Sequence, residues 1–187
     1  MIIRQGGVVA FPTETYYGLA ADPFNQSALK LLFSLKQRDY TKPVLTLVAV
    51  TEQLSLLARD VPDIYSSLIK RFWPGPLTLI FPAQDILPIL LTGRTGTVGV
   101  RISSHPAAQA LVKLLQGPVT ATSANISGHK PAIDAQEVRR QFGSSLDYIV
   151  DGGRTPGGSG STIIGQEAGS LKLIRAGVIP FEQLLTG

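Results

Sequence analysis

The stretch "TVGVRISSHPAAQALVKLL", residues 97–115, decides the class of fold because a strand pattern changes into a helix pattern within it. Residues 97–102 alternate in character as a strand does, and Pro106 stands where the first turn of a helix tolerates proline. Residues 107–115 then carry apolar side chains at helical spacing. A strand that leads directly into a helix favours a domain in which helices pack on a sheet.

Segments on either side extend this mixture. We predict strands at 8–11, 43–50 and 77–81, and in the runs "DYIV", "STII" and "LKLI" of the last third. We predict helices at 27–36, 54–58 and 64–72, and a further helix from Asp134 to Gly143. Because the last third gives strands without helices between them, the pattern favours an α/β (α+β) fold. We expect a twisted mixed β-sheet flanked by helices rather than a regular doubly wound sheet.

The first predicted helix has one apolar face. Its residues Ala28, Leu31, Leu32 and Leu35 fall on one side at helical spacing, so we expect that side to face the core. The run "WPGP", 73–76, ends a later helical segment because two prolines and a glycine cannot continue a helix.

The length of 187 residues suits one domain, 1–187, because a globular domain of roughly 150 residues already buries about 70% of its unfolded surface. The run "DGGRTPGGSGS", 151–161, is composed like a linker, but only 26 residues follow it. We therefore interpret it as a loop within the domain.

Composition narrows the chemistry. Seventeen Lys and Arg against thirteen Asp and Glu give a net charge of +4, which favours anionic partners such as a nucleotide, RNA or an acidic metabolite. The absence of cysteine excludes disulfides, thiol nucleophiles and thiolate zinc sites, and the two histidines argue against a transition-metal site built by the protein. No stretch of about 20 apolar residues occurs, so we expect no membrane association and a cytoplasmic protein.

Positive charges gather in "KQRDYTK", residues 36–42. Lys36, Arg38 and Lys42 are either solvated charges at a helix C-terminus or a phosphate site, where Arg offers a planar fork and Lys a point charge. Neither of the glycine-rich phosphate-loop motifs, GxxxxGK[ST] and GxGxxG, occurs in the chain.

Polar residues gather in three further places: after the predicted strand 8–11, within the predicted strand 97–102, and after residues 119–121, which begin like a buried strand. The hydroxyls of Thr13 and Thr15 in "FPTETYYGLA" belong either to a β-turn or to a site for a small polar ligand. Arg101 interrupts an apolar strand and requires solvent or a partner, for which a ligand carboxylate is one candidate. "TSANISG", 122–128, is either a tight turn or a cradle of neutral hydrogen-bonding groups. His105 and His129 are interpreted as turn residues rather than catalytic bases.

Six strings occur in order along nearly the whole chain: "GGVVAFPTETYYGLAAD", "KQRDYTKP", "WPGPLTLI", "VGVRISSHP", "TSANISG" and "STII…LIRAG". Together they resemble the YrdC/Sua5 family of L-threonylcarbamoyladenylate synthases, in particular its short, single-domain members. The most specific element is the Lys-x-Arg pair followed about 85 residues later by Ser-x-Asn. The resemblance implies a YrdC-like (DHBP synthase-like) fold with a basic concave face.

The resemblance also implies a reaction. L-threonine, bicarbonate and ATP would give L-threonylcarbamoyl-AMP and diphosphate, for the modification of adenosine 37 in ANN-decoding tRNAs. The product would pass to the threonylcarbamoyl transferase complex that acts on tRNA, and weak binding of tRNA or other RNA is a further expectation. Magnesium would be bound through the phosphates of ATP rather than by a metal site of the protein.

The site residues carry over from the matching strings. Lys36 and Arg38 would be the catalytic groups at the phosphates. The nucleotide would contact Arg38, Lys42, Thr97, Asn125 and Arg175. L-threonine would contact Thr13, Thr15, Arg101, Ser123 and Ser161.

Two other interpretations compete with this one. The first is an RNA-binding module without adenylate synthesis, favoured by the pI of about 9.5 but opposed by an aromatic content of only 7%. The second is carbamoyl-adenylate chemistry of the kind performed by hydrogenase maturation proteins. The chain lacks the acylphosphatase-like and zinc-finger segments that accompany that chemistry.

Overall fold

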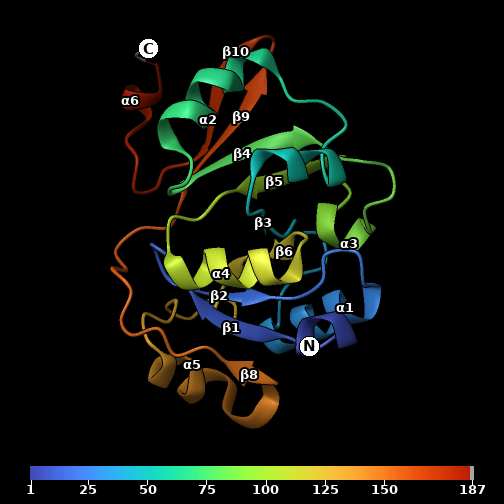
Figure 1. Cartoon of the computed structure of the whole chain (residues 1–187), viewed down its shortest axis with the longest axis vertical. Helices are drawn as coiled ribbons and strands as arrows, with labels where there is room; N and C mark the ends of the chain where they lie inside the picture. The colour runs from blue at the N-terminus through green and yellow to red at the C-terminus, as the bar shows by residue number, and fades with distance from the viewer. Residues whose placement is uncertain (186–187) are drawn as a thin grey trace.

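The computed structural model describes residues 1–185, whose strands form two β-sheets flanked by helices (Figure 1). The four-stranded sheet has the order β7-β2-β1-β8, and the six-stranded sheet has the order β10-β9-β4-β5-β3-β6. In Figure 1, β1 and β2 lie in the lower half of the molecule and β4, β9 and β10 in the upper half. The predicted mixed α/β class is confirmed, and the strands are divided between two sheets instead of one.

The four-stranded sheet consists of β1 (Val9–Pro12), β2 (Tyr17–Ala20), β7 (Thr122–Ser123) and β8 (Tyr148–Ile149). β1 and β2 form an antiparallel hairpin, and the turn between them contains residues 13–16. β7 pairs antiparallel with the outer side of β2, while β8 pairs parallel with β1. The turn 13–16, which continues the "PTET" string (residues 12–15), and the start of "TSANISG" therefore belong to neighbouring strands.

The six-stranded sheet consists of β3 (Thr46–Leu47), β4 (Leu77–Pro82), β5 (Thr97–Arg101), β6 (Val119–Thr120), β9 (Thr162–Glu167) and β10 (Ser170–Arg175). β4 pairs antiparallel with β5 and parallel with β9, and β9 and β10 form an antiparallel hairpin. β3 pairs parallel with β5 and antiparallel with β6. The segment from β8 to β9 crosses from one sheet to the other.

The helices are α1 (Gln26–Lys36), α2 (Ser66–Phe72), α3 (Ile89–Thr92), α4 (Pro106–Leu115), α5 (Ala135–Phe142) and α6 (Phe181–Leu185). Short 3-10 helices cover Ile2–Gln5, Thr51–Leu56, Asp63–Tyr65 and Gly143–Ser145. Asn25 caps α1 by accepting hydrogen bonds from two backbone N–H groups, and Asp134 caps α5 by accepting one from Glu137 at 2.8 Å. Both caps satisfy N–H groups that a helix cannot satisfy internally.

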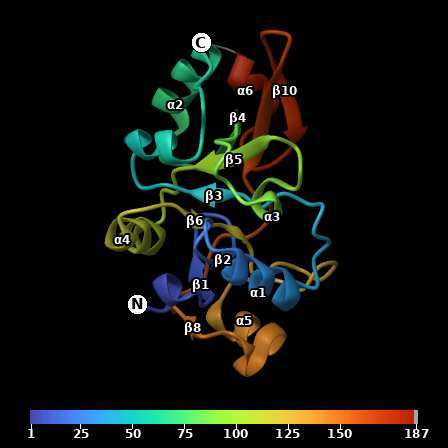
Figure 2. The same cartoon turned by 90° about the vertical axis from the view of Figure 1, so that its right-hand side faces the viewer.

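The two faces of β1 pack on different helices. Ala10 belongs to a core cluster with the buried side of α1, whereas Val9 and Phe11 belong to a second cluster with α4. This division follows from the alternation of side chains along a strand. Figure 2 shows α1 and α4 on opposite sides of the strands β1 and β2. The larger cluster contains residues of both sheets, and the single domain over residues 1–187 stays a prediction.

Several predicted elements are confirmed. The strand and helix that decide the fold class are β5 and α4, and Pro106 is the first residue of α4. The strands of the last third are β8, β9 and β10, and no helix lies between them among residues 148–175. The Asp134 start and Gly143 stop of α5 are also as predicted.

Other predictions were wrong in detail. Leu31 is exposed, and Leu29 and Phe33 are buried instead, so the buried face of α1 is rotated from the predicted one. The segment 43–50 contributes only the two residues of β3, although most of it is buried. The helix expected at 54–58 is a 3-10 helix that ends at Leu56.

Within residues 1–185, no helix is both long and apolar enough to cross a membrane.

Candidate active site

A cavity of about 600 Å³ lies where the two sheets meet. The four-stranded sheet contributes β2, β7 and the 13–16 turn to its wall, and the six-stranded sheet contributes β4, β5, β9 and β10. The loops 38–45 and 159–161 complete the lining, together with Ala121, Pro131 and Ala176. A cavity of this size suits a small-molecule ligand, for which volumes of about 300–1,000 Å³ are usual.

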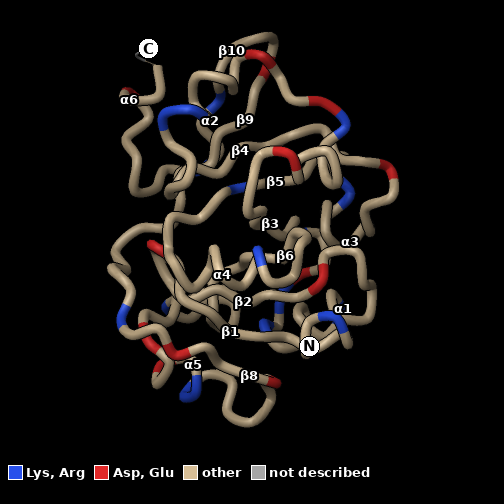
Figure 3. The backbone as a smooth tube through the Cα atoms, viewed as in Figure 1, with Lys and Arg blue, Asp and Glu red and all other residues tan. Residues whose placement is uncertain are grey.

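The charged side chains that line this cavity all carry positive charge. They are Arg38, Lys42, Arg101 and Arg175, and no Asp or Glu is found among its described lining residues. Acidic residues do occur elsewhere in the protein: Figure 3 shows Asp and Glu interspersed with Lys and Arg along the backbone. Burial lowers the pKa of Arg175, and the charges of Arg101 and Arg38 lower it further. The cavity is therefore suited to a ligand with several negative charges.

The structure brings most of the predicted site residues together. Eight of them line the cavity: Thr13, Thr15, Arg38, Lys42, Arg101, Ser123, Ser161 and Arg175. Three do not line it: Lys36, Thr97 and Asn125.

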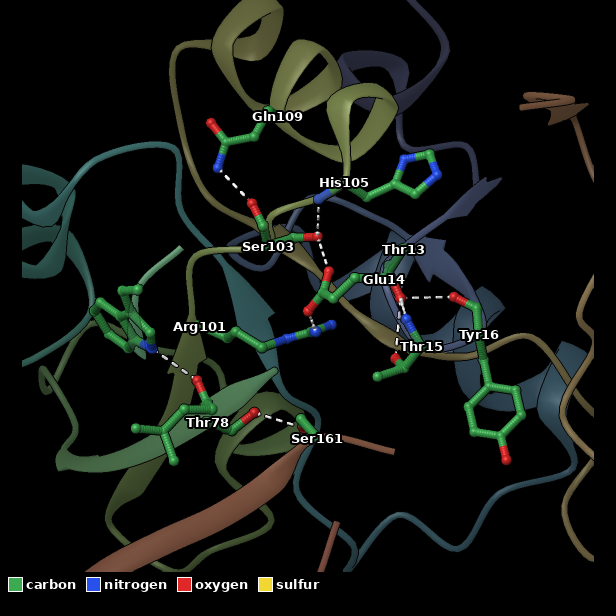
Figure 4. Close-up of polar contacts among 12 residues, drawn as sticks. Thr13, Glu14, Thr15, Tyr16, Thr78, Arg101, Ser103, His105, Gln109 and Ser161 are labelled. Atoms are coloured by element: carbon green, nitrogen blue, oxygen red, sulfur yellow. Dashed lines mark hydrogen bonds and ion pairs between the residues drawn. The ribbon is translucent and has the colours of Figure 1, made fainter. Parts of the chain in front are cut away.

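Thr13 and Thr15 form part of a hydrogen-bonded turn (Figure 4). The Thr13 hydroxyl donates to the carbonyl of Tyr16 at 2.7 Å and accepts from the Thr15 backbone N–H at 3.2 Å. The two hydroxyl oxygens are 3.1 Å apart. Because the Thr13 proton is used within the turn, the Thr15 hydroxyl is the freer of the two to contact a ligand.

Arg101 has a protein carboxylate as its partner. Its side chain is 7% exposed, and its guanidinium forms an ion pair with Glu14. The Ser103 hydroxyl donates to the second oxygen of the same carboxylate (Figure 4). Burial lowers the pKa of Arg101, and Glu14 acts in the opposite direction. The need for a partner was evident from the sequence, but Glu14 was missed as that partner. Its position between two threonines that line the cavity is the available signal.

Lys36 ends α1 and is buried behind the turn that contains Ser123 and Asn125. Its ammonium group donates to the backbone carbonyl of Ser123, to that of Asn125 at 2.8 Å, and to the Asn125 side-chain oxygen at 3.5 Å. Burial, and then the nearby charge of Arg38, lower the pKa of Lys36 to about 7. Lys36 therefore contacts the back of the cavity wall.

The Asn125 side chain is used within its own turn. Its Oδ1 accepts from the Ser123 hydroxyl at 2.6 Å, and its Nδ2 donates to the carbonyls of Ile126 and His129, each at 2.9 Å. Thr97, at the start of β5, has its hydroxyl oxygen 2.8 Å from that of Thr95. In this structure the groups of Asn125 and Thr97 that were predicted to contact the nucleotide contact other protein groups.

Arg38 enters the cavity wall because Gln37 adopts a left-handed conformation with a φ of 48°, which ends α1 and turns the chain. Arg38 donates from Nη2 to the carbonyl of Pro43 at 2.9 Å. Its Nε is buried and has no hydrogen-bond partner among residues 1–185. An unsatisfied buried donor costs about 1–3 kcal/mol, so this side chain is not at its most favourable arrangement.

Arg175 and Ser161 meet at the other side of the cavity. Arg175 Nη2 donates to the carbonyl of Ser161 at 2.7 Å and lies 3.1 Å from its hydroxyl oxygen, which in turn lies 2.8 Å from the Thr78 hydroxyl. Gly177 permits this arrangement, because a Cβ there would stand 2.4 Å from the backbone of Gly160. Thr78 was missed by the sequence prediction.

The loop 151–161 is attached to the first sheet by two tyrosines. The hydroxyl of Tyr17 donates to the carbonyl of Gly153, and that of Tyr16 donates to the carbonyl of Gly158, both at 2.7 Å. The backbone N–H of Gly157 donates to the carbonyl of Thr15 at 2.8 Å. These bonds hold the loop beside the cavity.

Among residues 1–185, no group of three or more His, Cys, Asp or Glu could hold a metal ion.

Comparison with known proteins gives the family. The Sua5/YciO/YrdC family model, described as "Telomere recombination", matches residues 1–177. The chain belongs to this family. It is 41% identical over 182 residues to a threonylcarbamoyl-AMP synthase of Pyrococcus abyssi, an alignment that covers 97% of this chain and 54% of that protein. It is 38% identical over 151 residues to a threonylcarbamoyl-AMP synthase of Cellvibrio japonicus, covering 81% of this chain and 80% of that one.

The fold of a family member with a bound amino acid is closely similar. The crystal structure of P. abyssi Sua5 complexed with L-threonine superimposes with a TM-score of 0.94 at 40% identity, covering 98% of this chain and 55% of that protein. The chain thus spans about half the length of the P. abyssi protein and four fifths of the C. japonicus one. The resemblance noted from the six sequence strings is confirmed.

Proposed function

We propose that this protein is a threonylcarbamoyl-AMP synthase, which converts L-threonine, bicarbonate and ATP into L-threonylcarbamoyl-AMP and diphosphate. The observation that carries the proposal is the cavity between the sheets, whose charged lining residues are all cations and whose neutral lining includes four predicted hydroxyl contacts. Relatives of this chain that carry the synthase name support it.

The chemistry requires two anions to be held together. Carbon dioxide or bicarbonate converts the amine of threonine to a carbamate, whose oxygen attacks the α-phosphorus of ATP and displaces diphosphate. The protein must align the carbamate with the α-phosphorus and stabilise negative charge on the phosphoryl oxygens. Guanidinium groups and hydroxyl donors in a partly enclosed cavity suit both tasks.

The lining residues divide between the two substrates. Arg38, Lys42 and Arg175 would contact the nucleotide, with Arg38 at the reacting phosphate. Arg101 would bind the carboxylate of threonine, and the hydroxyl contacts would come from Thr13, Thr15, Ser123 and Ser161. If Arg38 releases the carbonyl of Pro43 when the ligand binds, its unsatisfied Nε would be able to donate to an acceptor on the ligand.

The three residues outside the lining have other parts in this proposal. Asn125 would act through Ser123, to which it is hydrogen-bonded, and Thr97 would require a nucleotide that extends beyond the cavity lining. We assign Lys36 to holding the turn of Ser123 and Asn125 rather than to touching the phosphates, because its ammonium is directed at three oxygens of that turn.

Magnesium would arrive with ATP. The described lining offers no carboxylate, and oxygen ligands of that kind are what the ion prefers from proteins. The product would be used by a threonylcarbamoyl transferase complex that acts on tRNA. The synthase would also bind tRNA or other RNA weakly. The rival function is an RNA-binding module without adenylate synthesis, which the basic composition supports.

Diphosphate release from ATP tests the proposal. We expect release that requires both L-threonine and bicarbonate. Release that depends on neither would contradict the proposal, and RNA binding that collapses with salt in a protein without threonine-dependent release would favour the rival. The Arg38→Ala variant should fold normally and lose most of the release, because a charge-assisted contact is worth about 1.5–3 kcal/mol; unchanged turnover would remove Arg38 from the site.

A further inference from the structure

We infer that Glu14 is a positioning residue that orients Arg101 for recognition of the carboxylate of the amino-acid substrate. This inference rests on the proposed function, since it concerns the threonine side of the same cavity. It assigns a role to the one acidic residue of the "PTET" turn, which does not itself line the cavity.

The turn presents its residues in opposite directions. Thr13 and Thr15 line the cavity, while the Glu14 carboxylate between them is bound by Arg101 and Ser103 (Figure 4). Such alternation is expected where the chain leaves a strand, because successive side chains there point to opposite faces. The sequence Thr-Glu-Thr thus supplies two hydroxyls to the ligand side and one carboxylate to the support behind it.

The ion pair joins the two sheets. Glu14 lies in the connection between β1 and β2, whereas Arg101 is the last residue of β5, 87 positions further along the chain. Glu14 binds Nη1 of the guanidinium, and Arg101 also lines the cavity. A guanidinium has five N–H donors in a planar fork, so fixing one edge sets the direction of the remaining donors.

Glu14 is itself held in one orientation. The hydroxyl of Ser103 donates to one carboxylate oxygen, and that hydroxyl oxygen accepts from the backbone N–H of His105 at 3.2 Å. The side chain of Gln109 donates to the carbonyl of Ser103 at 2.7 Å. Ser103 is therefore attached to the start of α4, and Glu14 is only 14% exposed. This network restricts the motion of Arg101 before any ligand binds.

The test compares two ligands that differ only in the carboxyl group. Binding of L-threonine and of L-threoninol, the alcohol without the carboxylate, is measured by calorimetry on the full chain without ATP. For the unchanged protein we expect L-threonine to bind on the order of tenfold more tightly or better. Glu14→Gln keeps the size of the side chain and removes its charge. We expect this variant to weaken the binding of L-threonine by roughly tenfold and to leave the binding of threoninol nearly unchanged.

Three results would overturn the inference. Equal weakening of both ligands would indicate general structural damage, no change would show that Arg101 needs no support, and tighter L-threonine binding would show that Glu14 competes with the ligand for Arg101. Failure of the unchanged protein to bind L-threonine would instead count against the proposed function. Glu167→Gln, which breaks the exposed pair with Lys172, is the matched control and should alter neither ligand.

A second variant covers the case in which Glu14→Gln does not fold. Ser103→Ala removes one hydrogen bond to Glu14 and keeps the ion pair. We expect a smaller loss of preference for L-threonine over threoninol than for Glu14→Gln, by roughly two- to fivefold, because the lost hydrogen bond acts on the ligand only through Glu14 and Arg101. An unchanged preference in a folded Ser103→Ala protein would contradict the inference.

Discussion

Two buried cations lie at the cavity wall, Arg101 within its lining and Lys36 behind it, and they are stabilised in different ways. Arg101 pairs with the carboxylate of Glu14, so its charge is balanced by an opposite charge. Lys36 is surrounded by two backbone carbonyls and an amide oxygen, so only dipoles stabilise it. The difference predicts that Arg101 keeps its charge at all physiological pH values, whereas Lys36 is close to losing its proton.

Loss of Arg101 should have the largest effect. Arg101→Met leaves Glu14 buried without its counter-charge, and breaking a buried pair in this way destabilises proteins by about 3–5 kcal/mol. Urea unfolding measures the loss, and diphosphate release should also disappear. Combining the change with Glu14→Gln should recover part of the stability but none of the activity. A double variant no more stable than Arg101→Met would mean that the charge of Glu14 is not the cause.

Loss of Lys36 should have a smaller effect on stability. Lys36→Met keeps the unbranched stem of the side chain but leaves the carbonyls of Ser123 and Asn125 without their donor, at a cost of about 1–3 kcal/mol. Binding of both L-threonine and ATP should weaken, because the turn contains predicted contacts to each. If only ATP binding weakens, Lys36 contacts the phosphates, and the role assigned here to Lys36 is wrong.

The pH dependence of stability sharpens the comparison through an effect that is small for each single unit of pH. The pKa of Lys36 in the folded protein, about 7, is below the ordinary lysine value of 10.5, so the unfolded chain binds more protons between these values. The free energy of unfolding should therefore rise with pH above about 7, by at most about 1.4 kcal/mol per unit. Denaturation of the unchanged protein and of Lys36→Met at several pH values isolates the contribution of the Lys36 ammonium to stability. A difference between them that stays constant from pH 7 to 10 would place the pKa elsewhere.

Sequence reasoning recovered the secondary structure better than the contacts. Local patterns predicted β5 and α4 because a proline and two periodicities lie within one short stretch. The division into two sheets was not evident, since strand pairing joins residues far apart in the chain, as in the parallel pair of Leu77 with Thr162. Leu31 was misplaced because Leu29 and Phe33 give a second apolar face that spacing alone could not reject.

The same limit applies to the site. Residue types indicated that Arg101 needed a partner, but the partner lies 87 positions away in the chain. Lys36 and Asn125 were predicted to face the ligand because they belong to specific motifs, and a motif does not reveal which side of a turn its groups occupy. Only the structure shows that both residues are buried.

The late position of the β9–β10 hairpin in the chain affects how the protein folds during its synthesis on the ribosome. It supplies Ile163, Ile174 and Arg175 to the cavity, and β9 pairs with β4, which is synthesised well before it. A nascent chain can pair β1 with β2 and form α1, yet its cavity lacks a wall until this hairpin emerges. The cavity proposed for the nucleotide is therefore complete only in chains whose synthesis has passed β10.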